Sequence, residues 1–169
     1  GLDALGKIKI DYEPLDPVYD PIEAMKDSAP QVHEGGSNIY ATKVIQKGDV
    51  DRGFKEAFRV YENTFSTQMV EHVPMEPHAS IADWDGNGRV TLHSSLGRIT
   101  LGRADISRTL DIPINRVRIV ATVVGGNFGG KNEITTEPIL ALLSKKTGRP
   151  VKGIYTREDE FISSTTRHP

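Results

Sequence analysis

A glycine-rich loop with one aromatic residue is the stretch of this sequence best suited to hold a ligand. A run rich in β-branched residues over 117–124 leads into Gly125-Gly-Asn-Phe-Gly-Gly-Lys131, where four glycines surround Phe128. Glycine reaches positive φ at little steric cost, and without a Cβ it lets a ligand approach the backbone closely. The spacing leaves two interpretations open: a loop whose amides face a ligand, or a tight turn that leaves a buried strand.

A phosphate-binding loop is the main rival interpretation of this stretch. Gly125 and Gly130-Lys131 match the spacing Gly-x-x-x-x-Gly-Lys-[Ser/Thr], but Asn132 occupies the last position, where a hydroxyl is needed to ligate magnesium. A helix that began at Lys131 would also contain Pro138, which removes a backbone hydrogen bond at a cost of about 3 kcal/mol. The sequence therefore argues against nucleotide binding.

A partial calcium motif lies further upstream. Asp83-x-Asp85-x-Asn87-Gly88 matches the first half of a calcium loop, but Ser94 stands where a bidentate glutamate is required. Strong β-formers flank the motif, and Asp-Gly and Asn-Gly accept the left-handed conformations of primed turns. We therefore expect a β-hairpin here and no calcium site.

His72, Glu76 and His78 are residue types that bind metals. A spacing of six places both histidines on one face only in a strand, and Pro74 and Pro77 interrupt any regular element. No tight metal-binding signature fits this pattern. We expect a structural turn whose polar side chains are satisfied locally.

The composition excludes several classes of partner. The chain has 169 residues, of which 37% are hydrophobic and 26% charged, with a net charge of −2, which gives no electrostatic reason to expect nucleic acid or an anionic membrane. The absence of cysteine excludes disulfides and iron–sulfur ligation by this chain. No apolar run approaches the roughly eighteen residues of a membrane span, and the start lacks the features of a signal peptide. A cytoplasmic protein is the resulting expectation.

The hydrophobic periodicity predicts an α+β fold, in which a mixed or antiparallel sheet is flanked by several helices. Helices are expected over 2–5, after the cap Asp20, over 50–58 after the cap Asp49, over 100–111, between Thr136 and Gly148, and over 158–162. Strands are expected over 7–12, 60–69, 79–84, 89–93, 117–124 and 151–156, with an extended segment over 40–46.

Five arginines form a modest basic cluster in the middle of the chain. We expect most of them to be solvated or paired with Asp105 and Asp111. The five are Arg98, Arg103, Arg108, Arg116 and Arg118.

The glycine loop resembles the Gly-Gly-Gly-Phe-Gly-Gly-Lys loop of the xanthine dehydrogenase/aldehyde oxidase family, which lies beside the molybdenum–pterin cofactor in that family. Several short motifs extend the similarity in family order across nearly the whole chain, and together they are far more specific than any one alone. They are Asp11-Tyr-Glu-Pro-Leu15, Val32-His-Glu34, Val70-Glu-His-Val-Pro-Met-Glu-Pro-His78, Thr147-Gly-Arg-Pro-Val-Lys152, Thr156-Arg-Glu-Asp-Glu160 and Thr166-Arg-His-Pro169.

The resemblance implies an internal fragment of a longer molybdenum-binding chain. Residues 1–20 would be the tail of a preceding hammerhead-like domain with a linker, and residues 21–169 the N-terminal portion of the molybdopterin-binding domain. Family members hydroxylate aldehydes or nitrogen heterocycles with water as the oxygen source, and electrons leave through iron–sulfur clusters, usually to FAD, on other domains or subunits. The expected partners are those domains or subunits, the remainder of the molybdenum-binding chain and a small-molecule substrate.

Site residues follow from the same resemblance. Phe128 and Gly129 should present backbone and ring to the molybdenum ligands, while Gly125, Gly126 and Gly130 give the cofactor room. The catalytic glutamate of the family belongs to a distant C-terminal segment, so no catalytic residue and no metal ligand is assigned in this chain. The isolated fragment is expected to be inactive.

Three departures from the family pattern qualify this expectation. Asn127 replaces a glycine, which we attribute to the ease with which asparagine enters the left-handed region. Leu96 replaces a glutamine whose amide contacts an oxo ligand, which favours an alternative: a non-catalytic assembly module that binds no molybdenum. Asn132 stands where purine-oxidising members place a substrate-binding glutamate. It is therefore the candidate substrate residue and argues against a xanthine-like substrate.

Overall fold

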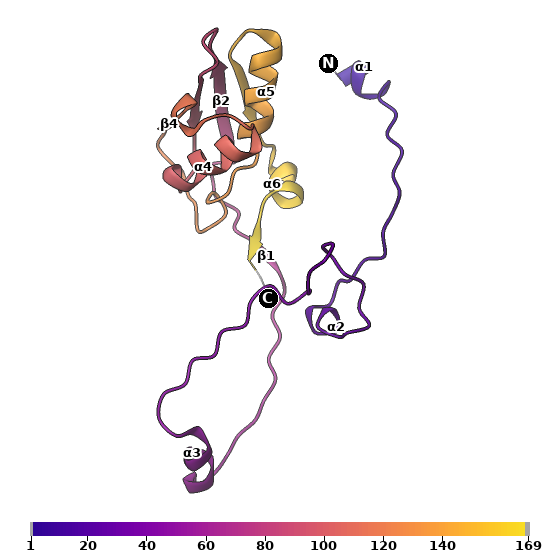
Figure 1. The fold of residues 1–169 in the computed structure, drawn as a ribbon, viewed down its shortest axis with the longest axis vertical. Coiled ribbons are helices and arrows are strands. Elements are labelled where there is room, and N and C mark those ends of the chain that lie inside the picture. The colour runs from indigo at the N-terminus through magenta and orange to yellow at the C-terminus, as the bar shows by residue number, and fades with distance from the viewer. Residues whose placement is uncertain (1, 168–169) are drawn as a thin grey trace. The chain divides into compact units, whose positions relative to one another are not determined.

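The computed structural model describes residues 2–167. The chain divides into two compact units, Gly1–Glu62 and Asn63–Pro169, and Figure 1 shows that regular structure is concentrated in the second. Among the described residues no helix is long and apolar enough to cross a membrane.

The first unit contains three short helices. They are α1 (Leu2–Leu5), α2 (Pro21–Ala24) and α3 (Val50–Glu56). The Asp20 carboxylate accepts hydrogen bonds from the second and third amides of α2, and Asp49 accepts one from the Arg52 amide in α3. Both predicted caps are confirmed.

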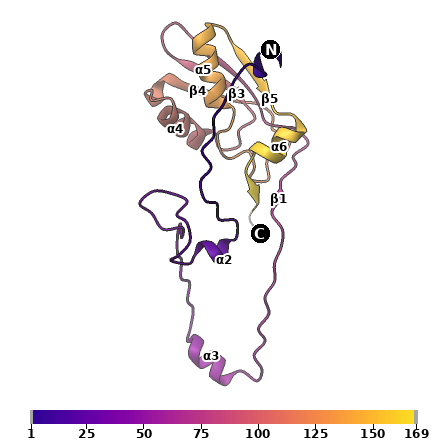
Figure 2. The same ribbon diagram turned by 90° about the vertical axis from the view of Figure 1, so that its right-hand side faces the viewer.

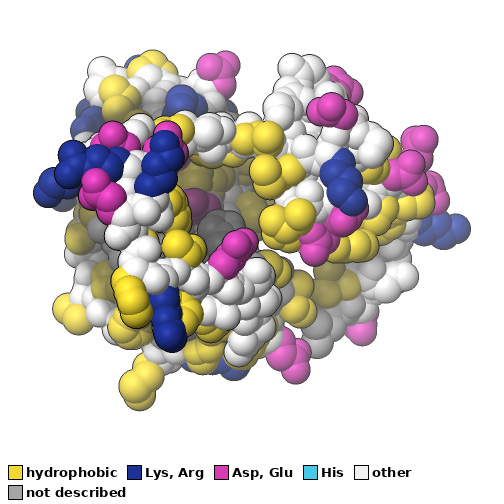
Figure 3. Space-filling model, turned by 90° about the horizontal axis from the view of Figure 1, so that it is seen from below, with side chains coloured by type: hydrophobic (Ala, Val, Ile, Leu, Met, Phe, Trp, Pro, Cys, Tyr) yellow, Lys and Arg dark blue, Asp and Glu magenta, His cyan; other side chains and the backbone are white. Residues whose placement is uncertain are grey.

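The strands predicted over 7–12 and 60–69 are absent from the described part of this unit and the segment after it. Their side chains are exposed, with Tyr12 at 81% and Phe65 at 87% of the maximum. Alternating polarity produces a strand only where a neighbouring strand can pair with it, and none does so here. Figure 3 shows hydrophobic side chains exposed on the face of the molecule that it draws.

The second unit is built on a mixed sheet of four strands. β2 (Ala79–Trp84) and β3 (Val90–Ser94) form an antiparallel hairpin, β4 (Val117–Ala121) adds in parallel to β3, and β5 (Val151–Ile154) adds antiparallel to β2. The strand order is therefore β4-β3-β2-β5, and a separate pair joins β1 (Val70–Glu71) to β6 (Thr166–Arg167). The predicted α+β class with a mixed sheet is confirmed.

Helices cover one face of this sheet (Figures 1 and 2). α4 (Ile99–Thr109) lies against β4, and α5 (Glu137–Thr147) lies against β2 and β5. A 3₁₀ turn (Ile114–Arg116) precedes β4, and α6 (Arg157–Ser163) follows β5. Local signals set the ends, since left-handed Gly148 ends α5 and a capping box begins α6. The predicted helix positions are confirmed to within a few residues.

The core lies between the sheet and these two helices. Ala82 pairs with Leu92 across the hairpin on the covered face, and both are fully buried. Ile106 of α4 and Leu140 of α5 close over them. Side chains at alternate positions point to the opposite face, where Ile81 is 39% exposed, as the two-residue period of a strand requires.

The hairpin turn explains the partial calcium motif. The Asp85 carboxylate accepts hydrogen bonds of 2.9 Å from the amides of Asn87 and Arg89, and Gly88 alone in the turn has a positive φ, of +76°. The turn is thus closed by Asp85 and one left-handed glycine, which differs from the primed turn we expected. No cluster of three or more metal-ligating side chains occurs among residues 2–167.

Gly102 in α4 is required by a close approach of Leu96. An added Cβ at Gly102 would lie 2.1 Å from Leu96 Cδ2, and Leu96 is only 3% exposed. Gly102 lowers the helix propensity of α4, but the absence of a side chain at this position leaves space in which Leu96 is buried.

We predict that Gly102→Ala lowers the free energy of unfolding by about 1–2 kcal/mol, because the buried leucine must leave its position. Unfolding can be followed by the fluorescence of Trp84 in β2. With Leu96→Ala added, Gly102→Ala should no longer destabilise and should gain up to about 1 kcal/mol from the higher helix propensity of alanine. Gly53→Ala in α3, where no atom lies within 4 Å, should likewise not destabilise the chain. Equal losses with and without Leu96 would refute the packing argument.

Candidate functional site

The glycine loop forms a tight turn with an unusual residue at its centre. The Gly130 amide donates to the Asn127 carbonyl over 2.8 Å, and the two residues between them, Phe128 and Gly129, have φ of +51° and +104°. These values are those of a type I′ turn, whose central positions favour glycine, asparagine and aspartate. A left-handed conformation costs an ordinary residue about 1–2 kcal/mol, yet the Phe128 ring is 74% exposed. Such strain at an exposed aromatic is a reason to look for function.

Asn127 stabilises this turn through its side chain. Its Oδ1 accepts hydrogen bonds from the amides of Gly129 (3.1 Å) and Lys131 (2.9 Å). Asn127 itself is not among the described residues with positive φ, so the reason given for its tolerance from sequence was wrong. The asparagine closes the turn in the manner of an Asx motif.

Three consecutive amides of the loop have no acceptor in the part of the chain that the structure describes. Within residues 2–167 the amides of Gly125, Gly129 and Gly130 are all hydrogen-bonded, whereas those of Gly126, Asn127 and Phe128 donate to no described group. Unpaired amides of a rigid loop are preorganised donors for an anionic ligand. The tight turn of one interpretation is therefore confirmed, and the interpretation in which the amides face a ligand stays a prediction.

Glu76 fixes both ends of the loop. Its Oε2 accepts hydrogen bonds of 2.7 Å from the Gly125 amide and from the Lys131 ammonium, and its own amide donates to the Gly125 carbonyl over 3.2 Å. An added Cβ at Gly125 would lie 2.7 Å from Glu76 Cβ, so glycine is needed for this contact. One carboxylate therefore ties the entrance of the loop to its exit.

The charges of this pair are unevenly buried. Lys131 is fully buried, while the Glu76 side chain is 33% exposed. Burial alone would raise the pKa of Glu76, but the hydrogen bonds from Lys131 and from the Gly125 amide hold it below its ordinary value. A lysine committed to an internal carboxylate, followed by a helix that begins only at Glu137, is incompatible with a phosphate-binding loop.

A second buried pair holds the centre of the loop. His78 Nδ1 lies 2.9 Å from Glu160 Oε1, and Nε2 lies 3.2 Å from the Gly130 carbonyl. His78 is 4% exposed and Glu160 is fully buried. Both ring nitrogens face oxygen acceptors, so either the ring donates from both or Glu160 carries the shared proton. In both cases His78 is held rigidly against the loop.

The histidines and Glu76 are therefore structural, as the sequence predicted, but their partners are not local. His72 Nδ1 lies 3.2 Å from the Thr165 carbonyl, 93 residues away, and Glu160 is 82 residues from His78. The expectation of locally satisfied side chains was wrong, because α6 and β6 fold back against this segment.

Leu96 and Asn132 lie beside the loop in different environments. Leu96 is buried against α4, so its side chain is part of the core. Asn132 is partly exposed, and its Oδ1 accepts a hydrogen bond of 3.2 Å from Asn127 Nδ2. Their neighbours in the chain are hydrogen-bonded to each other. Gly97, which follows Leu96, donates its amide to the carbonyl of Lys131, which precedes Asn132, over 2.7 Å.

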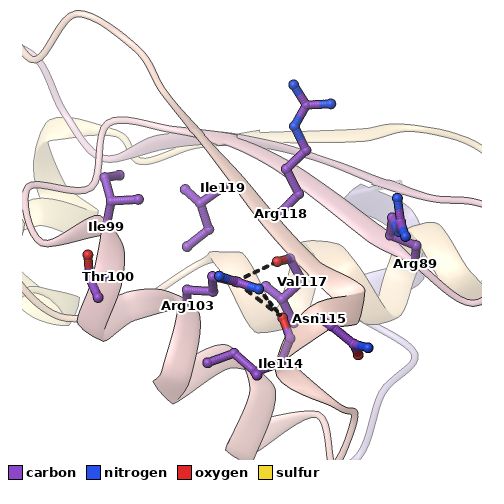
Figure 4. A pocket seen from close by; sticks show the side chains of 9 residues that line it. All are labelled: Arg89, Ile99, Thr100, Arg103, Ile114, Asn115, Val117, Arg118 and Ile119. Carbon is purple, nitrogen blue, oxygen red and sulfur yellow. Dashed lines mark hydrogen bonds between the residues drawn. The ribbon is translucent and has the colours of Figure 1, made fainter.

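The arginine cluster does not converge on one ligand. Arg108 pairs with Asp105 as expected, but no described carboxylate pair involves Asp111. In the cavity of about 420 Å³ beside β4, Arg103 donates to the carbonyls of Ile114 and Val117. Figure 4 shows that Arg118 points away from Arg103. This cavity therefore lacks a convergent anion-binding geometry.

We predict that Glu76→Gln lowers the free energy of unfolding by about 2 kcal/mol. Breaking a fully buried pair costs about 3–5 kcal/mol, and the partial exposure of Glu76 reduces that figure. Glu76→Gln/Lys131→Met should recover most of the loss in denaturant unfolding, since no unpaired ammonium then remains. A double variant as unstable as the single one would show that the buried charge is not the cause.

The same pair predicts acid sensitivity. Because the folded pKa of Glu76 lies below its ordinary value of 4.5, its stabilising contribution is fully present above that pH and is lost as the pH falls through the folded pKa. Asp159, whose hydrogen bonds with Thr156 lower its pKa, acts in the same direction. The stability difference between the natural chain and Glu76→Gln should therefore shrink in strong acid. A difference independent of pH would contradict the assignment.

Comparison with known proteins identifies the family to which this chain belongs. Residues 32–169 match the family described as molybdopterin cofactor-binding domain. The chain is 35% identical over 167 residues to the nicotinate dehydrogenase large molybdopterin subunit of Eubacterium barkeri, a match that covers 99% of this chain and 39% of that protein. It is 32% identical over 162 residues to the xanthine dehydrogenase molybdenum-binding subunit of Escherichia coli O157:H7, a match that covers 95% of this chain and 21% of that protein.

A solved structure agrees with these relatives. The aldehyde oxidoreductase of Desulfovibrio gigas superposes with a TM-score of 0.89 at 26% identity, covering 98% of this chain and 18% of that protein. The chain thus spans well under half the length of the proteins it matches. It belongs to the molybdopterin cofactor-binding domain family of molybdenum oxidoreductases.

Proposed function

We propose that this chain is part of the molybdenum-binding chain of a larger hydroxylase, and that the Phe128 loop forms one wall of its molybdopterin site. One observation carries the proposal: three consecutive amides with no acceptor among residues 2–167 lie beside an exposed, left-handed phenylalanine. The loop that contains them is held by the Glu76–Lys131 ion pair and by the buried His78–Glu160 pair. Rigid neutral donors suit the anionic ligands of a molybdenum centre, so the residues present fit the group.

The division of labour follows from these contacts. The amides of Gly126, Asn127 and Phe128 would orient the cofactor ligands. The absence of a side chain at Gly126 leaves room beside the Phe128 ring, since an added Cβ would lie 3.1 Å from Phe128 Cε2. When bound, the cofactor supplies the redox chemistry that hydroxylates a substrate with oxygen from water. The chain contributes placement and electrostatics, and this part of the site exposes an aromatic ring that can exclude water.

The wider assembly is proposed on the same basis. Its remaining parts are the rest of the molybdenum-binding chain and iron–sulfur and flavin domains or subunits, with residues 1–20 as the tail of a preceding domain. The substrate is an aldehyde or a nitrogen heterocycle, bound beside Asn132. The catalytic base lies outside this chain, the chain alone is inactive, and location in the cytoplasm stays a prediction.

A second candidate is an assembly module of the same family that binds no molybdenum. The observation in its favour is Leu96, which is buried and has no group with which to contact an oxo ligand. Molybdenum analysis of the purified full-length protein separates the two candidates: stoichiometric molybdenum supports the hydroxylase, and its absence supports the module.

We predict that Gly126→Ala reduces molybdenum retention of the full-length protein by at least about fivefold, since alanine cannot adopt a φ of +106° without strain. Its Cβ would also lie 3.1 Å from Pro74 Cβ. Gly86→Ala, in the hairpin turn with no atom within 4 Å, is the matched control. Molybdenum per protein by elemental analysis, with circular dichroism to confirm folding, gives the answer. Normal molybdenum in a folded Gly126→Ala variant would exclude the loop from the site.

A further inference from the structure

A second cavity opens beside the loop and contains the candidate substrate residue. It has a volume of about 700 Å³ and lies between α4 and the segment Asn132–Glu133. Arg98 and Arg108 contribute its positive charges, and Asp105 and Glu133 its negative ones. The side chains that line the cavity thus carry equal numbers of positive and negative charges, but not all of them form ion pairs.

The two arginines differ in what they can bind. Arg108 is paired with Asp105, whereas Arg98 forms no ion pair with a carboxylate of residues 2–167. Arg98 is exposed, so its guanidinium is accessible from the cavity it lines. A planar guanidinium binds a carboxylate in bidentate fashion, with both nitrogens donating.

The backbone at Arg98 is fixed relative to the loop. Gly97 immediately before it donates to the Lys131 carbonyl over 2.7 Å. An added Cβ at Gly97 would lie 1.9 Å from Asn127 Nδ2, so no larger residue fits between Arg98 and the turn. The backbone of Arg98 thus belongs to the same rigid unit as the Phe128 loop.

Asn132 supplies a matching donor. Its Oδ1 already accepts from Asn127 Nδ2 over 3.2 Å, which leaves its own NH₂ group without an acceptor among the described residues. A guanidinium and an amide NH₂ that line one cavity are both donors, and what they recognise together is an acceptor with a negative charge. Glu133 opposes such a ligand electrostatically, so the carboxylate must lie on the Arg98 side.

We propose that this cavity receives the substrate and that Arg98 and Asn132 bind a carboxylate group carried by it. This rests on the proposed function, because it makes the cavity beside the cofactor loop a substrate site. It narrows the substrate class to aldehydes or nitrogen heterocycles that carry a carboxylate.

The test is equilibrium binding to the full-length protein by calorimetry, with pyridine-3-carboxylate and pyridine-3-carboxamide as probes. The two share one ring and differ in charge. The natural protein should bind the carboxylate more tightly, and Arg98→Gln should weaken carboxylate binding about 10- to 100-fold while changing carboxamide binding little. Arg108→Gln, in the same cavity but already paired, is the matched control and should have a small effect.

Two further variants sharpen the result. Asn132→Ala should weaken carboxylate binding by a smaller factor, about 3- to 10-fold. Glu133→Gln should strengthen it a few-fold, because an opposing charge is removed. Equal affinity for the two probes, equal effects of Arg98→Gln and Arg108→Gln, or no binding of either probe would overturn the inference.

Failure of this inference is distinguishable from failure of the proposed function. Binding does not depend on turnover, and molybdenum content is measured separately on the same preparations. Carboxylate selectivity without molybdenum would leave the cavity assignment standing and reject the hydroxylase. Molybdenum without carboxylate selectivity would support the hydroxylase and reject the cavity assignment. Loss of stability in Arg98→Gln with no binding of the probes would assign Arg98 to a contact with another part of the parent protein.

Discussion

The buried ammonium of Lys131 is the constraint on which the loop depends. It is fully enclosed by protein, and its one described acidic partner is Glu76, so the carboxylate must stay within reach for the chain to remain folded. The same oxygen atom also binds the Gly125 amide. Because Glu76 must stay beside the Lys131 ammonium, its hydrogen bond to the Gly125 amide also fixes the backbone at Gly125. The segment that carries Glu76 is in turn held two residues later by His78 and its partner Glu160.

This arrangement explains how a glycine-rich loop can be rigid. Glycines leave the chain many conformations, and their ordering costs more entropy than that of other residues. Here two buried pairs hold the loop from outside, while Asn127 closes the turn from inside. The strain at Phe128 is thus offset by surrounding contacts, and three amides remain without an acceptor in the described part of the chain. Such preorganisation is what a donor surface needs in order to bind a charged cofactor without further rearrangement.

Local signals in the sequence predicted much of the second unit correctly. The Asp85–Gly88 hairpin and the end of α5 at Gly148 depend on residues close in sequence, and both were found where expected. Helix α5 also begins after Thr136 as predicted, but the Thr136 side chain makes no capping hydrogen bond to a described residue. The predictions of strands over 7–12 and 60–69 were wrong, because alternating polar and apolar residues do not show whether a partner strand exists. Those segments leave their apolar side chains exposed in the described structure.

The site was harder to predict than the fold. Glu76 and Lys131 are 55 residues apart and His78 and Glu160 are 82 apart, and no periodicity connects residues at such separations. The motifs that contain them were recognised, but as separate stretches whose contacts only the folded chain reveals. The glycines around Phe128 marked the loop as a candidate ligand site, but the roles of the individual residues came from the resemblance. The structure adds a physical reason, because it shows a strained turn with unpaired donors where sequence shows only a composition.

The central claim is that the amides of Gly126, Asn127 and Phe128 are the donors that meet the cofactor. Amide hydrogen exchange of the full-length protein, compared with and without molybdenum cofactor, tests it most directly. The account predicts fast exchange at these three amides without cofactor and strong protection with it, while the bonded amides of Gly130 and Lys131 change little. Unchanged exchange at all three on loading, or full protection without cofactor, would contradict the account.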